Sequence, residues 1–325
     1  MNHFGRLFQI NLFGESHGFA VGVLIDGCPP GIEIPMEELQ AYLDRRKPGQ
    51  LGTTPRKETD VPEFMSGIED GKTTGTPILI IFQNQNMQGK DYDDFLQTPR
   101  PGHADFVAQH KFRGFANLRG GGHFSARVTV GMVAAGFIAQ KILSSVEIMA
   151  EIVMAGGNQD IKKAVKRAVE ENDSIGALIR CMVKNLPVGL GEPFFDSMES
   201  VLAHVLFSIP AVKGVSFGSG FQAAVMKGSE HNDIFIDKTG KTKTNYAGGI
   251  NGGISNGNEV IIDIAFKPTA SIGKTQTTMN MKTGLMEELV VKGRHDACVA
   301  LRAPVIVESA VAIALADLWL IEKTR

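Results

Sequence analysis

Short apolar runs bounded by glycine mark the start of the chain. Residues 7–12 and 21–25 are such runs, and their spacing predicts two paired strands. Similar apolar runs recur along the sequence and predict strands over residues 77–83, 177–183, 221–225 and 260–266.

Other stretches carry their apolar residues at helical spacing. Residues 126–144 are apolar almost all round, which predicts a helix in the core. Residues 161–172 alternate Lys, Arg and Glu with Ile, Val and Ala, which predicts a surface helix. The same spacing predicts helices over residues 36–46, 198–208 and 305–321.

The most apolar stretch of the chain runs from residue 305 to residue 320. Glu308 and Asp317 interrupt it, and it is short for a membrane span. We therefore expect a buried helix there and no membrane partner.

Strands and helices mix along the chain without a regular β-α-β alternation. Residues 85–99 are polar and predict a long exposed loop, but no Pro/Ser-rich linker or block of charge divides the sequence. The pattern predicts an α+β fold in which residues 1–325 form a single large domain.

Composition narrows the kind of protein further. Hydrophobic residues make up 43% and charged residues 21% of the chain, as is typical of a soluble globular protein. With a net charge of −2, the protein has no positive electrostatic field that would attract polyanions, so we expect no nucleic-acid partner. Cys28, Cys181 and Cys298 lie far apart and lack metal-ligand spacing, which suits a reduced compartment. Since no secretory signal pattern opens the chain, we expect a cytoplasmic protein without a bound metal.

Four short polar motifs are flanked by glycine or carry a histidine beside an arginine. They contain Ser16-His17, His103, His123 and Asp296, with ionisable side chains beside residues that let backbone approach a ligand closely. Motifs so far apart in sequence are hard to explain by packing alone. We predict that they assemble one active site.

Each motif also has a structural explanation. His17 lies in a Glu-Ser-His-Gly stretch that is either a β-turn or the setting of a general acid. His103 is either an acid–base residue or part of a cap in which Asp105 begins a helix at Phe106. Asp296 is either catalytic or an ion-paired loop residue.

The arginine and glycine clusters favour anion binding. Arg45 and Arg46 either complement a helix dipole or bind phosphate or carboxylate, and Arg56 extends the cluster. The run Arg119-Gly-Gly-Gly-His123 feeds a helix near Ser125 and Arg127, so it is either an anion site or a hinge. Its spacing matches neither the dinucleotide-binding nor the Walker pattern.

A second glycine-rich segment covers residues 247–255. Together with Lys267-Pro268-Thr269-Ala270-Ser271, which follows a predicted strand, it suggests backbone folded over a flat ligand that carries phosphate, such as a flavin nucleotide.

The order of these motifs closely resembles the chorismate synthase family. The resemblance covers nearly the whole chain, and its strongest matches are residues 13–18, 43–49, 100–105, 186–196, 211–214, 228–233, 247–255, 267–269 and 293–296. It implies a β-α-β sandwich with a central helical layer between the sheets, usually assembled as a homotetramer.

The resemblance also implies an activity. Such an enzyme converts 5-enolpyruvylshikimate 3-phosphate to chorismate and phosphate by a 1,4-elimination, with reduced FMN required but not consumed. By the same resemblance, His17 is the acid near the leaving phosphate and His103 is the proton partner of the flavin at N1. Asp296, supported by Ser16, helps flavin N5 take the substrate proton.

Binding residues follow from the resemblance as well. Substrate, with two carboxylates and a phosphate, needs an arginine-rich pocket, for which the candidates are Arg45, Arg46, Arg56 and Arg127. Arg46 also matches a position assigned to NADPH in the family, which makes NADPH a possible reductant. The implied FMN contacts are His123, Phe124, Ser125, Pro210, Ala211, Gly252, Lys267, Pro268, Thr269, Ala270, Ser271 and Arg294.

The sequence departs from the usual family pattern in four places, one of which is a shortened stretch over residues 151–176. His123-Phe124 stands where Arg-Ser is common, Tyr246 where a histidine is usual, and Gln50-Leu51-Gly52 lacks the basic residue expected after Gly49. The altered flavin contact leaves two other hypotheses open. One is a catalytically silent protein that binds FMN or an anion, and the other is a flavin-dependent oxidoreductase that consumes its reductant.

Overall fold

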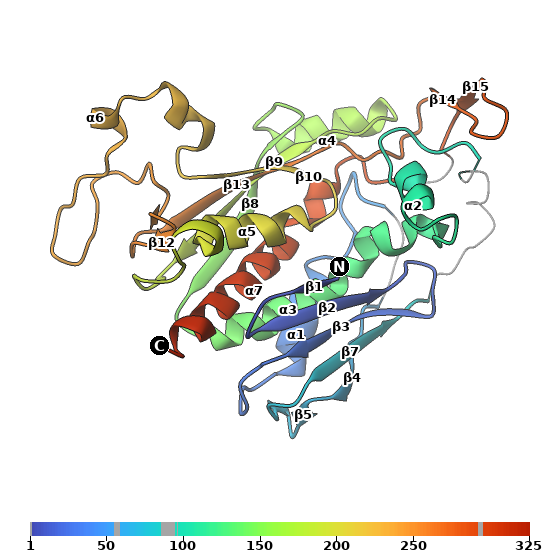
Figure 1. Cartoon of the computed structure of the whole chain (residues 1–325). Coiled ribbons are helices and arrows are strands. Elements are labelled where there is room, and N and C mark those ends of the chain that lie inside the picture. Colours follow the sequence, from blue (N-terminus) through green and yellow to red (C-terminus); the bar gives the residue numbers. More distant parts are fainter. Residues whose placement is uncertain (1, 55–58, 86–94, 96, 292–294) are drawn as a thin grey trace.

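Two antiparallel sheets organise the molecule. The computed structural model describes residues 2–54, 59–85, 95, 97–291 and 295–325. The first sheet has the strand order β1-β2-β3-β7-β4, formed by β1 (His3–Phe4), β2 (Gln9–Gly14), β3 (Ala20–Asp26), β7 (Ile78–Gln83) and β4 (Glu63–Ser66) (Figure 1). The predicted pair of strands at the N-terminus is confirmed, since β2 and β3 pair directly.

The second sheet comes from the C-terminal half of the chain. Its order is β10-β13-β9-β8, formed by β10 (Val212–Phe217), β13 (Val260–Phe266), β9 (Ala177–Lys184) and β8 (Glu147–Ala155). Strand β13 buries every second residue, beginning with Val260 and Ile262. This alternation follows from the two faces of a strand and fixes its inner face against the helices.

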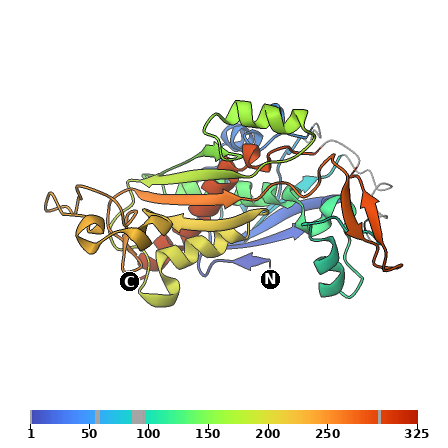
Figure 2. The ribbon, with the colours of Figure 1, turned by 90° about the horizontal axis from the view of Figure 1, so that it is seen from above.

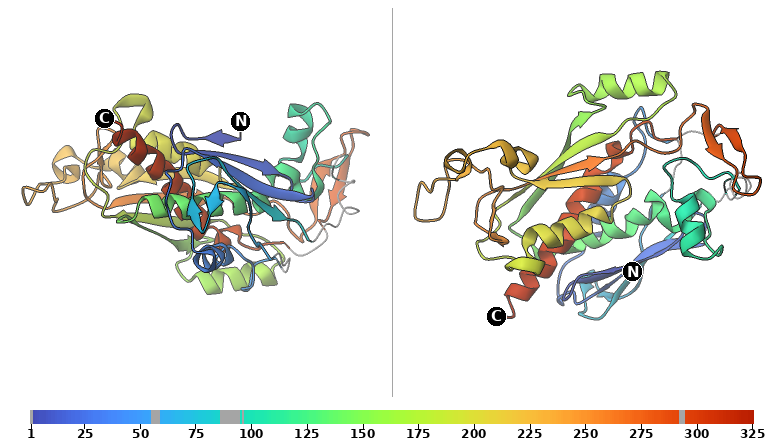
Figure 3. Two further views of the ribbon diagram at one scale, coloured as in Figure 1. Left: turned by 90° about the horizontal axis from the view of Figure 1, so that it is seen from below. Right: turned by 45° about the horizontal axis from the view of Figure 1, so that its top comes forward.

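Long helices lie between the two sheets. Helix α3 (Thr129–Ile142) packs on β3 of the first sheet, and α7 (Pro304–Glu322) packs on β8 of the second (Figures 2 and 3). The two helices also pack on each other so closely that a Cβ at Gly136 would lie 2.2 Å from the Cβ of Ser309. Glycine at this crossing therefore lets the two helices meet.

The apolar helix α7 is a core helix. By length and composition it could cross a membrane, but its residues from Val305 to Leu318 are buried in the molecule. Its two acidic residues accept hydrogen bonds from backbone outside the helix. Asp317 accepts hydrogen bonds from the backbone N–H groups of residues 6, 7 and 8, and Glu308 accepts one from the N–H of Ala150. The predicted buried helix is confirmed.

Shorter helices and hairpins pack around the two sheets and the helices between them. Helices α1 (Met36–Asp44) and α5 (Met198–Phe207) pack on α3 and α7, and α4 (Ile161–Glu170) packs on β8. Figure 1 places the β11–β12 hairpin and α6 at one end of the molecule and α2 with the β14–β15 hairpin at the other. Their bounds are β5 (Ile68–Glu69), β6 (Lys72–Thr73), α2 (Asp105–Lys111), α6 (Gly228–His231), β11 (Ile250–Asn251), β12 (Ile254–Ser255), β14 (Gln276–Met279) and β15 (Met286–Leu289).

Mixed helices and strands confirm the α+β class, but some elements differ from the prediction. Residues 221–225 belong to a 3₁₀ helix, Gly220–Val225, rather than to a strand, and Phe221 and Val225 are exposed. Strands β8 and β10 were missed because charged residues and glycine interrupt their apolar pattern. Most of the predicted loop at residues 85–99 lies outside the described residues.

Candidate active site

The glycine-rich turn Arg119–Phe124 separates two of the candidate histidines. Gly120, Gly121 and Gly122 have φ angles of 59°, 85° and 53°, a conformation that side chains disfavour. A Cβ at Gly120 would lie 1.9 Å from Nδ1 of His17, and one at Gly121 would lie 3.9 Å from Nε2 of His103. Gly120 thus lies against the His17 ring, and Gly121 lies near the His103 ring.

The loop between β2 and β3 carries Ser16 and His17. Its backbone is tied to the glycine turn twice, because Ser16 N donates to Gly122 O at 3.1 Å and His123 Nδ1 lies 2.8 Å from Gly14 O. Ser16 is fully buried. The two predicted motifs, 100 residues apart in the sequence, form one unit in the structure.

His103 is oriented by two charged neighbours. Its Nδ1 lies 2.6 Å from Oδ1 of Asp105 and 3.0 Å from Nη2 of Arg100. A guanidinium only donates and a carboxylate only accepts, so the closer Asp105 contact assigns the Nδ1 proton to a bond with Asp105. That arrangement leaves Nε2 on the side of Gly121.

Asp105 is not the helix cap that the alternative required. The N-cap of α2 is Ala104, and the Asp105 carboxylate instead accepts from Arg100 Nε and Nη2, both at 2.8 Å. Burial opposes ionisation of Asp105, but the hydrogen bonds from Arg100 and His103 outweigh it and hold the pKa of this carboxyl well below its usual range.

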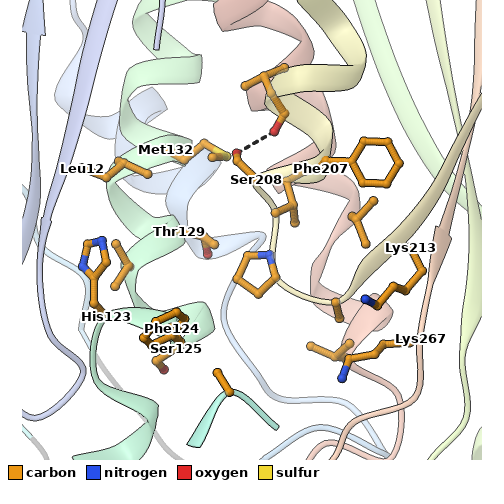
Figure 4. A pocket seen from close by; sticks show the side chains of 18 of the residues that line it. Leu12, His123, Phe124, Ser125, Thr129, Met132, Phe207, Ser208, Lys213 and Lys267 are labelled. Carbon is orange, nitrogen blue, oxygen red and sulfur yellow. Dashed lines mark hydrogen bonds between the residues drawn. The ribbon is translucent and has the colours of Figure 1, made fainter. Parts of the chain in front are cut away.

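A cavity of about 590 Å³ opens beside His103 and the end of the glycine turn, and neither Ser16 nor His17 is among its lining residues (Figure 4). Figure 4 shows His123, Phe124 and Ser125 on one side of the cavity, with Lys213 and Lys267 across from them. Ten of the predicted residues line it, namely His103, His123, Phe124, Ser125, Pro210, Ala211, Lys267, Pro268, Thr269 and Ala270.

Two lysines give this cavity positive charge. Burial and the neighbouring Lys213 lower the pKa of Lys267, whose Nζ donates to Gly102 O at 2.5 Å. Placing like charges together costs energy unless an anion compensates them. The pair therefore favours a ligand with a phosphate or carboxylate group.

A buried arginine cluster lies next to the cavity. Asp60 is 2% exposed and accepts from both Arg46 and Arg127. Burial disfavours the charge of Asp60, but Arg46 and Arg127 lower its pKa below the usual value. Burial and the positive charges of Arg127 and Arg302 lower the pKa of Arg46, although Asp60 opposes this. The cluster holds three guanidiniums within one electrostatic environment.

Asp296 joins the same cluster. Its Oδ2 accepts from Arg302, and its Oδ1 accepts from the Thr54 N–H at 2.8 Å. Arg46 and Arg302 line a cavity of about 20 Å³, which shares Thr129, Ile209, Pro210 and Val299 with the larger one. Asp296 is therefore ion-paired, as the alternative stated, and its ion pair lies beside the candidate site.

The remaining predicted residues lie in different places. Arg45 forms an ion pair with Glu308 of α7 and is not among the cavity-lining residues. Gly252 lies in the β11–β12 hairpin at the far end of the molecule (Figure 1). Ser271 is buried and accepts from Arg100 Nη1 at 3.1 Å. Arg56 and Arg294 lie outside the described residues.

Sequence reasoning missed several residues that shape the site. Arg100 opens the matched segment 100–105, and Lys213 lies within the matched segment 211–214, so both offered a signal. Asp60, Asn84 and Arg302 offered none, since each becomes informative only through partners far away in the sequence.

Histidines and lysines around a cavity, with an arginine cluster beside it, are typical of an enzyme for a small anionic ligand. The profile of the chorismate synthase family matches residues 8–320. A chorismate synthase from Chitinophaga pinensis is 54% identical over 324 residues, which cover 99% of this chain and 98% of the relative. One from Microcystis aeruginosa is 46% identical over 350 aligned positions, which cover 97% and 95%.

Solved structures agree with this assignment. A crystal structure of chorismate synthase matches with a TM-score of 0.77 at 25% identity and covers 98% of this chain and 93% of its own. The chain belongs to the chorismate synthase family, and it is a lyase that forms chorismate from a small-molecule substrate in the shikimate pathway. This family is known to use reduced flavin.

Proposed function

We propose that this chain eliminates phosphate and a ring proton from 5-enolpyruvylshikimate 3-phosphate to form chorismate, with reduced FMN required but not consumed. The observation that supports the proposal is that adjacent glycines of one turn lie against His17 and near His103, and that His103 lines the cavity. A general acid and a proton carrier are needed close together for such an elimination.

The residues present fit a flavin nucleotide. The cavity volume of about 590 Å³ lies in the usual range for cofactor sites. Phe124 and Pro210 offer flat apolar surface, and Lys213 and Lys267 offer charge for a phosphate. Reduced flavin, when bound, supplies transient electron donation to the substrate. Its proposed holders at this cavity are His123–Ser125, Pro210, Ala211 and Lys267–Ser271, with Arg294 as a further candidate, whereas Gly252 is not among the residues that line the cavity.

The chain's own side chains neutralise and protonate the leaving group. His17 donates a proton to the departing phosphate, so that less charge remains on it in the transition state. Arg46 and Arg127, with Arg56 as a further candidate, hold the carboxylates and phosphate of the substrate, while Arg45 is engaged by Glu308. The buried positions of Arg46 and Arg127 support this role, because guanidiniums act more strongly where water is excluded.

The ring proton of the substrate involves a second group of side chains, on the flavin side of the site. His103 Nε2 holds a proton toward the flavin N1 position, while Asp105 fixes the opposite nitrogen. Asp296, with Ser16 in support, would lie toward the flavin N5 position, where a bound reduced flavin would accept the substrate proton. The contact with Arg302 holds the Asp296 side chain in place for this role.

Several finer features belong to the same proposal. A single hydrophobic cluster extends from Phe8 to Leu318, which supports one domain over residues 1–325 built as a β-α-β sandwich. We propose a cytoplasmic homotetramer, as the resemblance implies. NADPH acts near Arg46 if the chain reduces its own flavin.

Anaerobic turnover tests the proposal. Enzyme, reduced FMN and substrate should yield equal amounts of chorismate and phosphate over many turnovers, with the flavin still reduced. Consumption of one reductant per product would favour an oxidoreductase. Binding of FMN without phosphate release would favour a catalytically silent protein.

A further inference from the structure

Asn84 holds the loop that carries His17 at both of its ends. This residue directly follows β7, and its backbone N–H donates to Phe19 O at 3.1 Å. Its side-chain Nδ2 donates to Glu15 O at 3.0 Å and to Gly18 O at 2.8 Å. Three hydrogen bonds from one residue therefore enclose Ser16 and His17 on either side.

The opposite face of the same amide contacts the arginine cluster. Arg127 Nε donates to Asn84 Oδ1 at 2.9 Å. Because a guanidinium only donates and backbone carbonyls only accept, the amide has one permitted orientation, with oxygen toward Arg127 and nitrogen toward the loop. Asn84 is 6% exposed, so a flipped amide would leave buried groups without partners.

The contacts continue beyond Arg127. Its Nη1 binds Asp60, whose second carboxylate oxygen accepts from Arg46 Nη2. The chain of contacts thus runs from the His17 loop through Asn84, Arg127 and Asp60 to Arg46. Every side chain along it from Asn84 onward is buried, where such bonds resist competition from water.

We propose that Asn84 is a positioning residue that fixes the His17 loop to the Arg127–Asp60–Arg46 cluster, so that the proton donor and the guanidiniums keep one relative geometry. This inference rests on the proposed function, in which His17 protonates the group that the guanidiniums hold. A small displacement of a catalytic group is enough to lower turnover without abolishing binding.

The variant Asn84→Asp tests the inference with almost no change of shape. Its carboxylate keeps the bond to Arg127 but turns an acceptor toward the carbonyls of Glu15 and Gly18, which repel it. We expect kcat to fall by about 10- to 100-fold, as for a misplaced catalytic group. The KM for substrate and the affinity for FMN should change by much less.

Asn245→Asp is the matched control. Asn245 also donates to a backbone carbonyl, that of Glu259, and accepts from a backbone N–H, that of Gly249, but neither partner lines the cavity. Hydrogen–deuterium exchange gives a readout independent of turnover. Exchange in residues 15–19 should rise in N84D and stay at the wild-type level in N245D.

The outcomes separate this inference from the proposed function. Wild type that forms no chorismate contradicts the function. Wild type that turns over, with an N84D kcat equal to that of N245D or with unchanged exchange in the His17 loop, overturns the role of Asn84. If N84D does not fold, Asn84→Ser removes the amide contacts to Glu15, Gly18 and Arg127 without adding a charge, and a loss of kcat of the same order is expected.

Discussion

Gly120 lies against the imidazole of His17, so that a Cβ at position 120 would fall 1.9 Å from Nδ1 of that ring. Gly120 therefore has two roles: it allows the positive φ of the turn, and it leaves room for the His17 ring. Replacing Gly120 by a larger residue should displace His17 without removing any ionisable side chain of the site.

Gly120→Ala should lower kcat by about 100-fold, because the added methyl displaces His17 and strains a φ of 59°. Steady-state kinetics with saturating reduced FMN measure this. Gly71→Ala is the control, since Gly71 has a φ of 72° but nothing within 4 Å of its Cβ position. Equal kcat values for the two variants would show that the contact with His17 is irrelevant.

Lys213→Ala should weaken FMN binding, because it removes one of two positive charges from the cavity. One exposed charge interaction is worth about 1 kcal/mol, or about a fivefold change in Kd. Fluorescence titration at low and high salt measures the effect, which should shrink as salt increases. Lys162→Ala on the exposed α4 surface is the control and should leave Kd unchanged. An unaltered Kd in K213A would remove Lys213 from the phosphate site.

Asp105 should stabilise the fold in a pH-dependent way. Its folded-state pKa is depressed below the unfolded value, so its contribution is present above about pH 4 and is lost as the pH falls toward the folded pKa. Asp105→Asn should cost about 2 kcal/mol at pH 7. Urea unfolding of both proteins between pH 7 and 3 checks this, and the gap should narrow only at the acid end. A gap that is constant over the whole range would contradict the shift.

Gly136→Ala should destabilise the protein where α3 crosses α7. The added methyl would lie 2.2 Å from the Cβ of Ser309, and overpacking of this kind costs about 1–3 kcal/mol. Thermal unfolding measures the loss as a lower Tm. Gly228→Ala, in helix α6 with open space at the Cβ position, should show no loss. A Tm in G136A as high as in G228A would show that α3 and α7 accommodate the added methyl without loss of stability.

The sequence predicted elements best where the hydrophobic pattern was strong. Strand β13 and helices α5 and α7 lie within one residue of their predicted bounds. Strand β10 escaped detection because Lys213 and Gly214 interrupt its apolar residues, and only pairing with β13 makes it a strand. Local patterns do not contain such long-range pairing.

In the candidate site too, residues with a local sequence signal were predicted, and residues defined by distant partners were not. Motif residues such as His103 and Lys267 were predicted because glycine and proline beside a charged group are visible in the sequence, and the structure places both at one cavity. Asp60 and Asn84 were not predicted, because a lone polar residue has no meaning until its buried partners are known. Arg45 resembled its neighbour Arg46, yet the adjacent position on the chain turns it toward Glu308.

Phosphate release by His17→Ala tests the central claim most directly. Single-turnover assays with preformed reduced enzyme should show a rate at least 100-fold below wild type, since general acid catalysis contributes about 10²–10⁴-fold. FMN affinity should stay near the wild-type value. His110→Ala, on the exposed side of α2, should release phosphate at the wild-type rate. A rate in H17A within a few fold of wild type would contradict the account.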